Sequence, residues 1–156
     1  MTPIRLALEG DIPQLCGLLA ELFAQEAEFS PDAEVQACGL RTIIASPDTG
    51  SILVAGEPGH IIGMVSLLYL TSTALGGRVA QLEDMVVAAG YRGAGLGDRL
   101  LDAAIDHARA AGCRRITLLT DGGNADAQRF YMRHGFVRSG MLPMRLLLDR
   151  VGRPLT

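Results

Sequence analysis

The sequence predicts a single mixed α/β domain, of the α/β or α+β class, over residues 1–156. A chain of 156 residues with 49% hydrophobic residues is long and apolar enough to bury one core. The predicted elements follow the order strand, two helices, three strands, helix, strand, helix and two strands. The strand–helix–strand passage at residues 81–120 requires a right-handed crossover between parallel strands, whereas the hairpin before it is antiparallel. A mixed sheet with helices on both faces follows.

The N-terminal third predicts one short strand and two helices. Apolar residues alternate with polar or small ones over residues 4–8, which is typical of a strand. Asp11 caps a helix that runs to about Glu28, and Pro13 suits its first turn. A second helix is expected at about residues 31–45, where the segment SPDTG ends it.

Three strands and a long helix are expected in the middle of the chain. Residues 51–70 read SILVAGEPGHIIGMVSLLYL, which predicts two strands joined by the turn GEPG. The segment RVAQLEDMVV at residues 78–87 predicts the next strand, and a glycine cluster ends it. From Leu96 apolar residues recur at helical spacing until Gly112, so an amphipathic helix is expected there.

The C-terminal third predicts a strand, a helix and two terminal strands. The segment RRITLLT predicts the strand, and the turn DGGN leads into a helix at residues 125–134 that Gly135 closes. Residues 136–138 and 141–148 are expected to add two further strands. Because an exposed apolar strand favours association, we expect the last one to pair with a second copy in a homodimer.

Composition argues against several classes of function. All 14 basic residues are arginine, so neither a Schiff-base lysine nor a P-loop lysine is available. A net charge of −3 and an aromatic content of 4% argue against a nucleic-acid partner. Cys16, Cys38 and Cys113 lack metal-ligand spacing, and His107 and His134 are expected on the surface. No metal site is therefore predicted.

The sequence also predicts that the chain has no membrane partner. The longest apolar run, at residues 61–70, is too short to span a bilayer and is broken by Gly63 and Ser66. The N-terminus lacks the charged and apolar regions of a signal peptide. We therefore expect a soluble, cytoplasmic protein.

Three glycines, Gly93, Gly95 and Gly97, alternate where a predicted strand passes into a predicted helix. Glycine allows a ligand to approach the backbone closely, and the N–H groups of a first helical turn are anion donors. Arg92 would add charge-assisted bonds, so the junction predicts a cradle for a diphosphate, with a structural tight turn as the alternative. Asp98 stands where a dinucleotide-binding fingerprint requires its third glycine, which disfavours that class.

Two motifs lie in order along the chain. Arg92, Gly95 and Gly97 form the pattern R-x-x-G-x-G, preceded by EDMVV and followed by the amphipathic helix. The segment NADAQRFYMRHGF at residues 124–136 is the second motif and lies downstream of the first. Together these motifs resemble those of the GNAT superfamily of acetyl-CoA-dependent N-acetyltransferases.

The resemblance implies a fold and a coenzyme site. A GNAT-like sheet is mixed and mostly antiparallel, and its central parallel pair splays apart. Pantetheine is expected in that gap, along the backbone of Met85, Val86 and Val87, and Asn124 is expected to contact the coenzyme. The diphosphate is expected on the amides of Arg92, Gly93, Ala94, Gly95, Leu96, Gly97 and Asp98. Asp98 departs from the small hydroxyl residue common in the family, and we expect it to contribute its N–H alone.

Acyl transfer from a thioester to an amine requires a neutral amine, a polarised carbonyl and a proton for the departing thiolate. Glu83 is expected to be the general base, with Asp84 in a structural role, because strand alternation sends the two to opposite faces. A base that acts through water, or two merely solvated carboxylates, are the alternatives. The resemblance implies that Tyr131 is the general acid, with a core aromatic as the alternative, and that a backbone amide near Val86 polarises the carbonyl.

The resulting expectation is an N-acetyltransferase that moves an acetyl group directly from acetyl-CoA to the primary amine of a small molecule. Acetyl-CoA is the donor co-substrate and no metal is expected. A non-enzymatic acyl-CoA sensor or interaction module, and a protein or peptide N-acetyltransferase, are the alternatives. The residues that select the acceptor are expected in the first two helices and in the loop LTSTALGGRV.

Overall fold

The computed structural model describes residues 1–25 and 32–149. In chain order its elements are β1 (Ile4–Leu6), the 3₁₀ turn η1 (Glu9–Asp11), α1 (Ile12–Gln25), α2 (Ala33–Ala45), β2 (Gly50–Glu57), β3 (His60–Ser72), β4 (Gly77–Val87), the 3₁₀ turn η2 (Ala89–Tyr91), α3 (Leu96–Ala110), β5 (Ile116–Leu118) and α4 (Ala125–Arg133). The expected end of the first helix near Glu28 and the expected start of the second helix at residue 31 lie outside the described residues.

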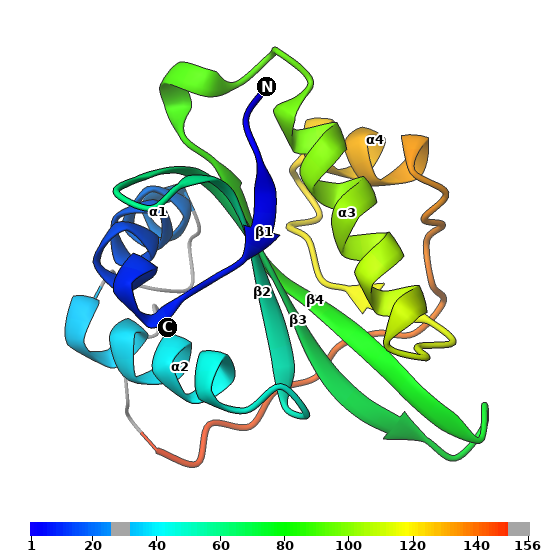
Figure 1. Cartoon of the computed structure of the whole chain (residues 1–156). Helices are drawn as coiled ribbons and strands as arrows, with labels where there is room; N and C mark the ends of the chain where they lie inside the picture. The colour runs from blue at the N-terminus through cyan, green and yellow to red at the C-terminus, as the bar shows by residue number, and fades with distance from the viewer. Residues whose placement is uncertain (26–31, 150–156) are drawn as a thin grey trace.

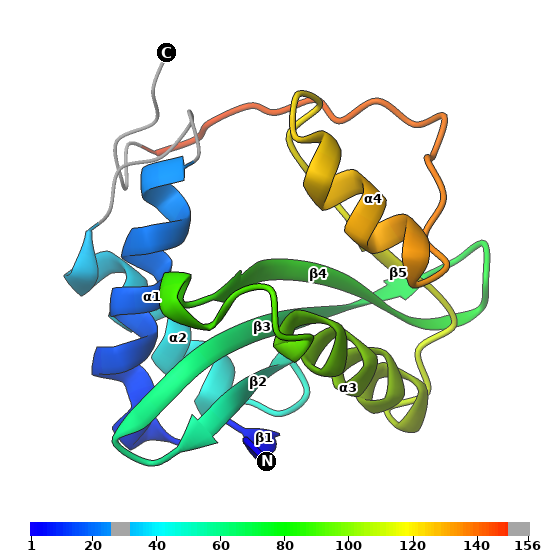
Figure 2. The same ribbon diagram turned by 90° about the horizontal axis from the view of Figure 1, so that it is seen from above.

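One mixed sheet organises the fold. Its strand order is β1-β2-β3-β4-β5, and all neighbouring strands are antiparallel except β4 and β5, which are parallel. Helices α1 and α2 cover one face of the sheet, and α3 and α4 lie on the other side (Figures 1 and 2). The predicted class, a mixed sheet between two layers of helices, is confirmed. The parallel pair forms one end of the described sheet.

Two apolar cores hold the helices on the sheet. Leu100 and Leu101 of α3 are fully buried and pack in one cluster with Val65 of β3. On the opposite face, Leu15 of α1 packs in a second cluster with Met64 of β3. Each fully buried leucine contributes about 1.5–3 kcal/mol through removal of apolar surface from water. The glycine loop that precedes α3 is therefore attached to a helix that is firmly packed on the sheet.

A partly buried ion pair ties the first strand to the 3₁₀ turn that precedes the first helix. The Asp11 carboxylate accepts hydrogen bonds from Arg5, at 2.8 and 3.1 Å, and from the Leu8 N–H at 2.8 Å. The Arg5 hydrogen bond holds the pKa of Asp11 below its ordinary value, although burial opposes this. Asp11, expected as a helix cap, ends the 3₁₀ turn directly before α1.

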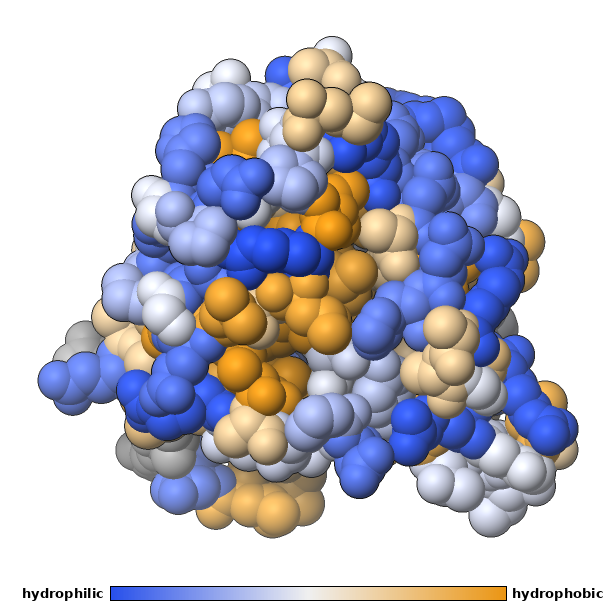
Figure 3. Space-filling view, viewed as in Figure 1, coloured by the Kyte–Doolittle hydropathy of each residue, from blue (hydrophilic) through white to orange (hydrophobic). Residues whose placement is uncertain are grey.

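Apolar side chains are also exposed beside β1. Figure 3 shows them over the middle of the face seen in Figure 1, over β1 and between the α1–α2 pair and α3. Leu6 on β1 and Leu8 after it are each about half exposed. This apolar surface belongs to the edge of the sheet that is opposite β5.

The two parallel strands separate after three paired residues. Ala80, Gln81 and Leu82 of β4 pair with β5, whereas β4 continues to Val87. Residues 83–87 therefore have β3 on one side and, among the described residues, no strand on the other. The separation leaves backbone groups of β4 available to a ligand, which matches the splayed pair that the family resemblance implies.

The two predicted terminal strands are wrong. In the described part of the chain, residues 136–138 and 141–148 form no strand. After α4 this segment runs away from β5, toward the side of the molecule where α1 and α2 lie (Figures 1 and 2). Alternating apolar residues indicate which side chains favour burial, but a strand also requires a sheet edge within reach of its backbone.

Candidate active site

The loop between β4 and α3 is built around two left-handed glycines. Gly93 has a φ of 83° and Gly95 has a φ of 81°, a backbone region that side chains other than glycine rarely adopt. Gly95 is the residue before the first turn of α3, and it has no side chain to bond the helix N–H groups. The glycines thus let the chain turn sharply into α3 while its first N–H groups stay uncapped.

Seven consecutive backbone N–H groups at this junction have no protein acceptor. Within the described chain, the N–H groups of residues 92–98 make no hydrogen bond to backbone or side chain, and the first paired one is that of Arg99, which donates to the Gly95 oxygen at 3.2 Å. Unpaired N–H groups at a helix N-terminus, together with the positive end of the helix dipole, bind anions such as phosphate. The predicted cradle therefore has the donors that it needs.

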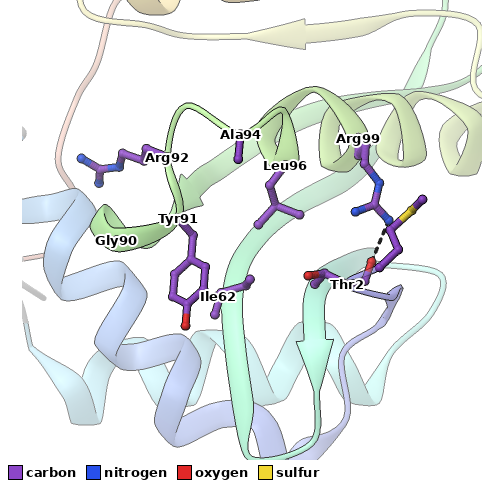
Figure 4. A pocket seen from close by; sticks show the side chains of 9 residues that line it. Thr2, Ile62, Gly90, Tyr91, Arg92, Ala94, Leu96 and Arg99 are labelled. Atoms are coloured by element: carbon purple, nitrogen blue, oxygen red, sulfur yellow. Dashed lines mark hydrogen bonds between the residues drawn. The ribbon is translucent and has the colours of Figure 1, made fainter.

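Arg92 is positioned by the end of β4. Its Nε donates a hydrogen bond to the Val87 oxygen at 2.8 Å, and Figure 4 shows its guanidinium directed away from α3. The side chain is exposed, so its terminal nitrogens can turn to meet an anion on the cradle. The same bond occupies the Val87 carbonyl at the open edge of β4.

The backbone of β4 beside the open edge has a defined direction. The Ala88 N–H donates to the Ile62 oxygen of β3 at 2.8 Å, and Val86 lies opposite Met64. Because polar groups alternate in direction along an antiparallel strand, those of Val86 point toward β3, and those of Met85 and Val87 point toward the open edge. An extended ligand in the gap would thus pair with Met85 and Val87, rather than with Val86.

A β-bulge lies at the two candidate bases. Ser66 pairs with Glu83 and Met64 pairs with Val86, so Asp84 and Met85 together lie opposite a single residue of β3. Asp84 has a φ of 48°, the left-handed region in which a residue other than glycine is uncommon. The bulge breaks the strict alternation on which the expected opposite orientation of Glu83 and Asp84 depends.

The carboxylates have different partners within the bulge. The Glu83 Oε1 accepts a hydrogen bond from the Gln81 Nε2 at 2.8 Å. The buried Ser66 hydroxyl donates to the Glu83 backbone oxygen at 3.2 Å and lies 3.5 Å from the Asp84 Oδ2. Glu83 is thus held by one side chain of its own strand, whereas Asp84 is part of the backbone irregularity itself.

Tyr131 lies in an apolar environment on α4. Its ring packs edge-on against Phe130 and Phe136, with centroid distances of 5.2 and 5.7 Å. Burial raises the pKa of Tyr131 to about 12. Its hydroxyl has no hydrogen-bond partner among the described side chains, so it is a protonated donor at neutral pH without a competing protein acceptor.

Asn124 and Gly97 position α4 beside the cradle. The Asn124 Oδ1 accepts from the Ala127 N–H at 3.0 Å, which caps α4 as predicted. A Cβ on Gly97 would lie 3.6 Å from the Phe130 ring, so α3 and α4 approach closely at the start of α3. The helix with Tyr131 is therefore packed directly against the turn that contains the free amides.

The Asp98 side chain binds α4. Its Oδ1 lies 2.7 Å from the His134 Nε2 and 3.6 Å from an Arg133 nitrogen. The His134 hydrogen bond, opposed by burial, holds the pKa of Asp98 below its ordinary value. This arrangement agrees with the expectation that Asp98 offers its N–H alone to a ligand.

The prediction of a surface role for His134 is wrong. Its side chain is only 9% exposed and bonds carboxylates at both ring nitrogens, with the Asp102 Oδ1 at 2.9 Å from Nδ1. Asp98 and Asp102 are one helical turn apart, which indicates that one side chain could bond both carboxylates. The sequence does not identify that side chain, because His134 lies more than thirty residues downstream. His107 bonds the Ser51 hydroxyl at 2.9 Å, outside the candidate site.

A hollow of about 340 Å³ lies beside the glycine loop (Figure 4). Tyr91, Leu96 and Arg99 line it together with the first two residues of the chain, and the Arg99 guanidinium donates to the Thr2 oxygen at 2.6 Å. This bond ties the N-terminus to α3. The sequence offered no signal for this contact, because the two residues are 97 positions apart.

The described residues contain no group of three or more histidine, cysteine or acidic side chains that could hold a metal ion. Over residues 1–25 and 32–149, no helix is both long and apolar enough to pass through a bilayer.

A mixed sheet that opens at its parallel pair, next to an uncapped glycine-rich helix start, matches the fold that the resemblance to acetyltransferases implies. The chain belongs to the acetyltransferase (GNAT) family, whose family model matches residues 14–136. It is therefore an acyltransferase, and the family generally uses acetyl-CoA as the acetyl donor.

Two curated relatives and one solved structure illustrate the similarity. The chain is 28% identical over 136 residues to an aminoalkylphosphonate N-acetyltransferase of Salmonella typhimurium, covering 87% of this chain and 85% of the relative. It is 37% identical over 89 residues to a glucosamine 6-phosphate N-acetyltransferase of Trypanosoma brucei brucei, covering 56% and 58% of the two chains. A putative acetyltransferase from Agrobacterium tumefaciens superposes with a TM-score of 0.77 at 27% identity, covering 92% of this chain and 99% of that one.

Proposed function

We propose that this protein transfers an acetyl group directly from acetyl-CoA to the primary amine of a small molecule. The observation that carries the proposal is the run of unpaired N–H groups at residues 92–98, next to the open edge of β4. These features fit the two polar parts of the coenzyme, since a diphosphate requires several converging donors and pantetheine requires a free strand edge.

The residues of the cradle and of β4 have separate tasks in this proposal. The amides of residues 92–98 and the Arg92 guanidinium bind the diphosphate, and Asn124 adds a contact from the start of α4. Met85 offers its edge groups to pantetheine and Val87 offers its N–H, since Arg92 occupies the Val87 carbonyl. One of the two N–H groups polarises the thioester carbonyl. Acetyl-CoA, when bound, brings the activated acetyl group within reach of the acceptor amine.

Tyr131 is the proposed general acid. Its pKa of about 12 keeps the hydroxyl protonated over the whole neutral range, so a proton is available for the departing thiolate. The neighbouring Phe130 and Phe136 rings make the surroundings of Tyr131 apolar, which strengthens its interaction with a developing negative charge.

Glu83 is the proposed general base. An ammonium group must lose a proton before it attacks a carbonyl, and the Glu83 carboxylate has only one side-chain donor, Gln81, among the described residues. Its second oxygen is available to accept the proton, directly or through a water molecule. Asp84 is assigned to the bulge, where its backbone conformation and its contact with Ser66 support the strand edge.

The printed names of the two curated relatives suggest the class of acceptor. An aminoalkylphosphonate and glucosamine 6-phosphate each combine an amine with a phosphonate or phosphate group. We propose small amines of this kind as the first acceptors to examine.

A thiol-release screen with acetyl-CoA should give turnover with small primary amines. The turnover rate with these amines should be higher than the rate with peptides or proteins. Coenzyme binding by calorimetry without turnover on any amine would favour an acyl-CoA sensor, and turnover on peptides alone would favour a protein-modifying enzyme.

A cytoplasmic location without a nucleic-acid or membrane partner belongs to the same proposal. The described cysteines, Cys16, Cys38 and Cys113, are free thiols, which fits a reducing compartment. A net charge of −3 disfavours binding to a polyanion.

Replacement of Tyr131 by phenylalanine tests the acid. Tyr131→Phe should lower kcat by about 100-fold, because the thiolate then departs without a positioned proton donor. The dissociation constant for coenzyme A should change little, since the ring and its packing remain. Tyr69→Phe, on β3 and bonded to Ser51, is the matched control and should keep wild-type turnover. A kcat for Tyr131→Phe within about twofold of wild type would rule out the acid assignment.

Two amide substitutions separate the candidate bases. Glu83→Gln keeps the size of the side chain but removes the proton acceptor, so kcat should fall by about 100-fold. Asp84→Asn should lower the free energy of unfolding more than it lowers kcat, because Asp84 is placed in the bulge. Steady-state kinetics and urea unfolding measure the two effects. The opposite pattern would transfer the role of base to Asp84, and a small effect on kcat in both variants would leave water as the base.

We also propose a homodimer in which a second copy covers the C-terminal segment, residues 137–148. Its large apolar side chains are almost fully exposed at Val137, Met141, Leu142, Met144, Leu146 and Leu148, and soluble proteins rarely leave such a surface uncovered. Light scattering after size exclusion should give the mass of a dimer. The double variant Met144→Asp, Leu146→Asp should give a monomer. Leu8 is an exposed apolar residue elsewhere on the surface, so the control variant Leu8→Asp should remain a dimer. A wild-type monomer would contradict the proposal.

A further inference from the structure

His134 lies between two carboxylates at the contact of α3 with the end of α4. Its Nε2 is 2.7 Å from the Asp98 Oδ1, and its Nδ1 is 2.9 Å from the Asp102 Oδ1. The ring is tilted against Phe130, with centroids 5.1 Å apart. Water therefore has little access to either ring nitrogen.

This geometry requires a particular protonation state. Ionised carboxylates only accept hydrogen bonds, whereas a neutral imidazole has one N–H donor and one lone pair. Both contacts are hydrogen bonds only when His134 has two N–H groups, as an imidazolium. The other charged group at this contact is Arg133 of α4, whose guanidinium nitrogen is 3.6 Å from the Asp98 Oδ1. The site thus combines two negative charges from α3 with two positive charges from the end of α4.

The cluster adjoins the candidate coenzyme site on two sides. Asp98 lies in the first turn of α3, and its own N–H is the last of the unpaired donors. His134 follows α4 directly, and its N–H donates to the Tyr131 oxygen at 3.0 Å. A carboxylate in the first turn that was not paired would repel a diphosphate bound to the same amides.

We propose that His134 is a positioning residue whose imidazolium holds the Asp98 carboxylate away from the diphosphate cradle. Coenzyme affinity should then decrease when the His134 charge is removed. The inference rests on the proposed function, because it requires a coenzyme diphosphate on the amides of residues 92–98. It assigns to this chain a charge coupling between the end of α4 and the cradle.

The sign of the coupling follows from the charges. The His134 imidazolium and Arg133 together offset the charge of Asp98, and the cradle accepts an anion. A neutral side chain at position 134 would leave the Asp98 charge offset by Arg133 alone. Since the His134 hydrogen bond also lowers the pKa of Asp98, the carboxylate is ionised at neutral pH.

Calorimetric titration with coenzyme A at neutral pH tests the inference. His134→Gln should raise the dissociation constant by about tenfold, in the usual range of coupling between sites. Asp98→Asn should bind coenzyme A at least as tightly as wild type, because it removes the charge that repels the diphosphate. His107→Gln, at a residue bonded to Ser51 outside the site, is the control and should keep wild-type affinity.

The double variant separates this role from a purely structural one. If an unopposed Asp98 charge causes the loss in His134→Gln, Asp98→Asn in the same chain should restore affinity to within about threefold of Asp98→Asn alone. A structural role of His134 predicts no rescue, since the contact of α3 with α4 stays broken. Absence of rescue, or His134→Gln with wild-type affinity, would overturn the inference.

Two further outcomes have defined meanings. If His134→Gln does not fold, as judged by circular dichroism, the affinity of Asp98→Asn decides. Affinity at least equal to that of wild type would support the inference, and a clear loss of affinity would overturn it. If the wild-type protein binds no coenzyme A, the proposed function fails and the inference falls with it. Normal wild-type binding with unaffected variants overturns the inference alone.

Discussion

The separation of β4 from β5 after Leu82 is the constraint on which the site depends. A backbone edge inside a sheet is normally satisfied by a neighbouring strand, and here that neighbour stops after three residues. The chain then leaves β4 through a glycine loop and begins α3 without a capping side chain. Two sets of unsatisfied backbone groups therefore lie in succession, one along β4 and one at the start of α3. Both sets of groups belong to the main chain. The site can therefore be kept while the side chains vary widely.

The packing around this gap maintains it. Leu100 and Leu101 hold α3 on the sheet, and the close approach of Gly97 to Phe130 places α4 against the first turn of α3. Tyr131 lies on the same helix within an aromatic cluster, where burial raises its pKa. The contact between His134 and Asp98 fixes the other end of α4 to the same turn. The candidate acid and the candidate anion cradle are thus parts of one packed unit.

Local sequence patterns predicted most of the fold for clear physical reasons. Helical spacing of apolar residues predicted α3, and the glycine pattern predicted the turn into it, because both depend on neighbouring residues. The two terminal strands could not be predicted, since alternation at residues 141–148 does not show whether a sheet edge is within reach. The bulge at Asp84 was also hidden, because it is set by the register against Ser66 and Met64 of another strand. His134 was misplaced for the same reason, as both its partners lie on a helix distant in sequence.

The central claim is that the amides of residues 92–98 hold the coenzyme diphosphate while the edge of β4 holds pantetheine. Amide ¹⁵N–¹H NMR spectra of the protein titrated with coenzyme A test this claim most directly. The account predicts that the largest shifts fall on residues 92–98 and on Met85 and Val87, with smaller shifts at Val86, whose N–H points toward β3. Shifts confined to other elements, with these amides unchanged at saturation, would contradict the account.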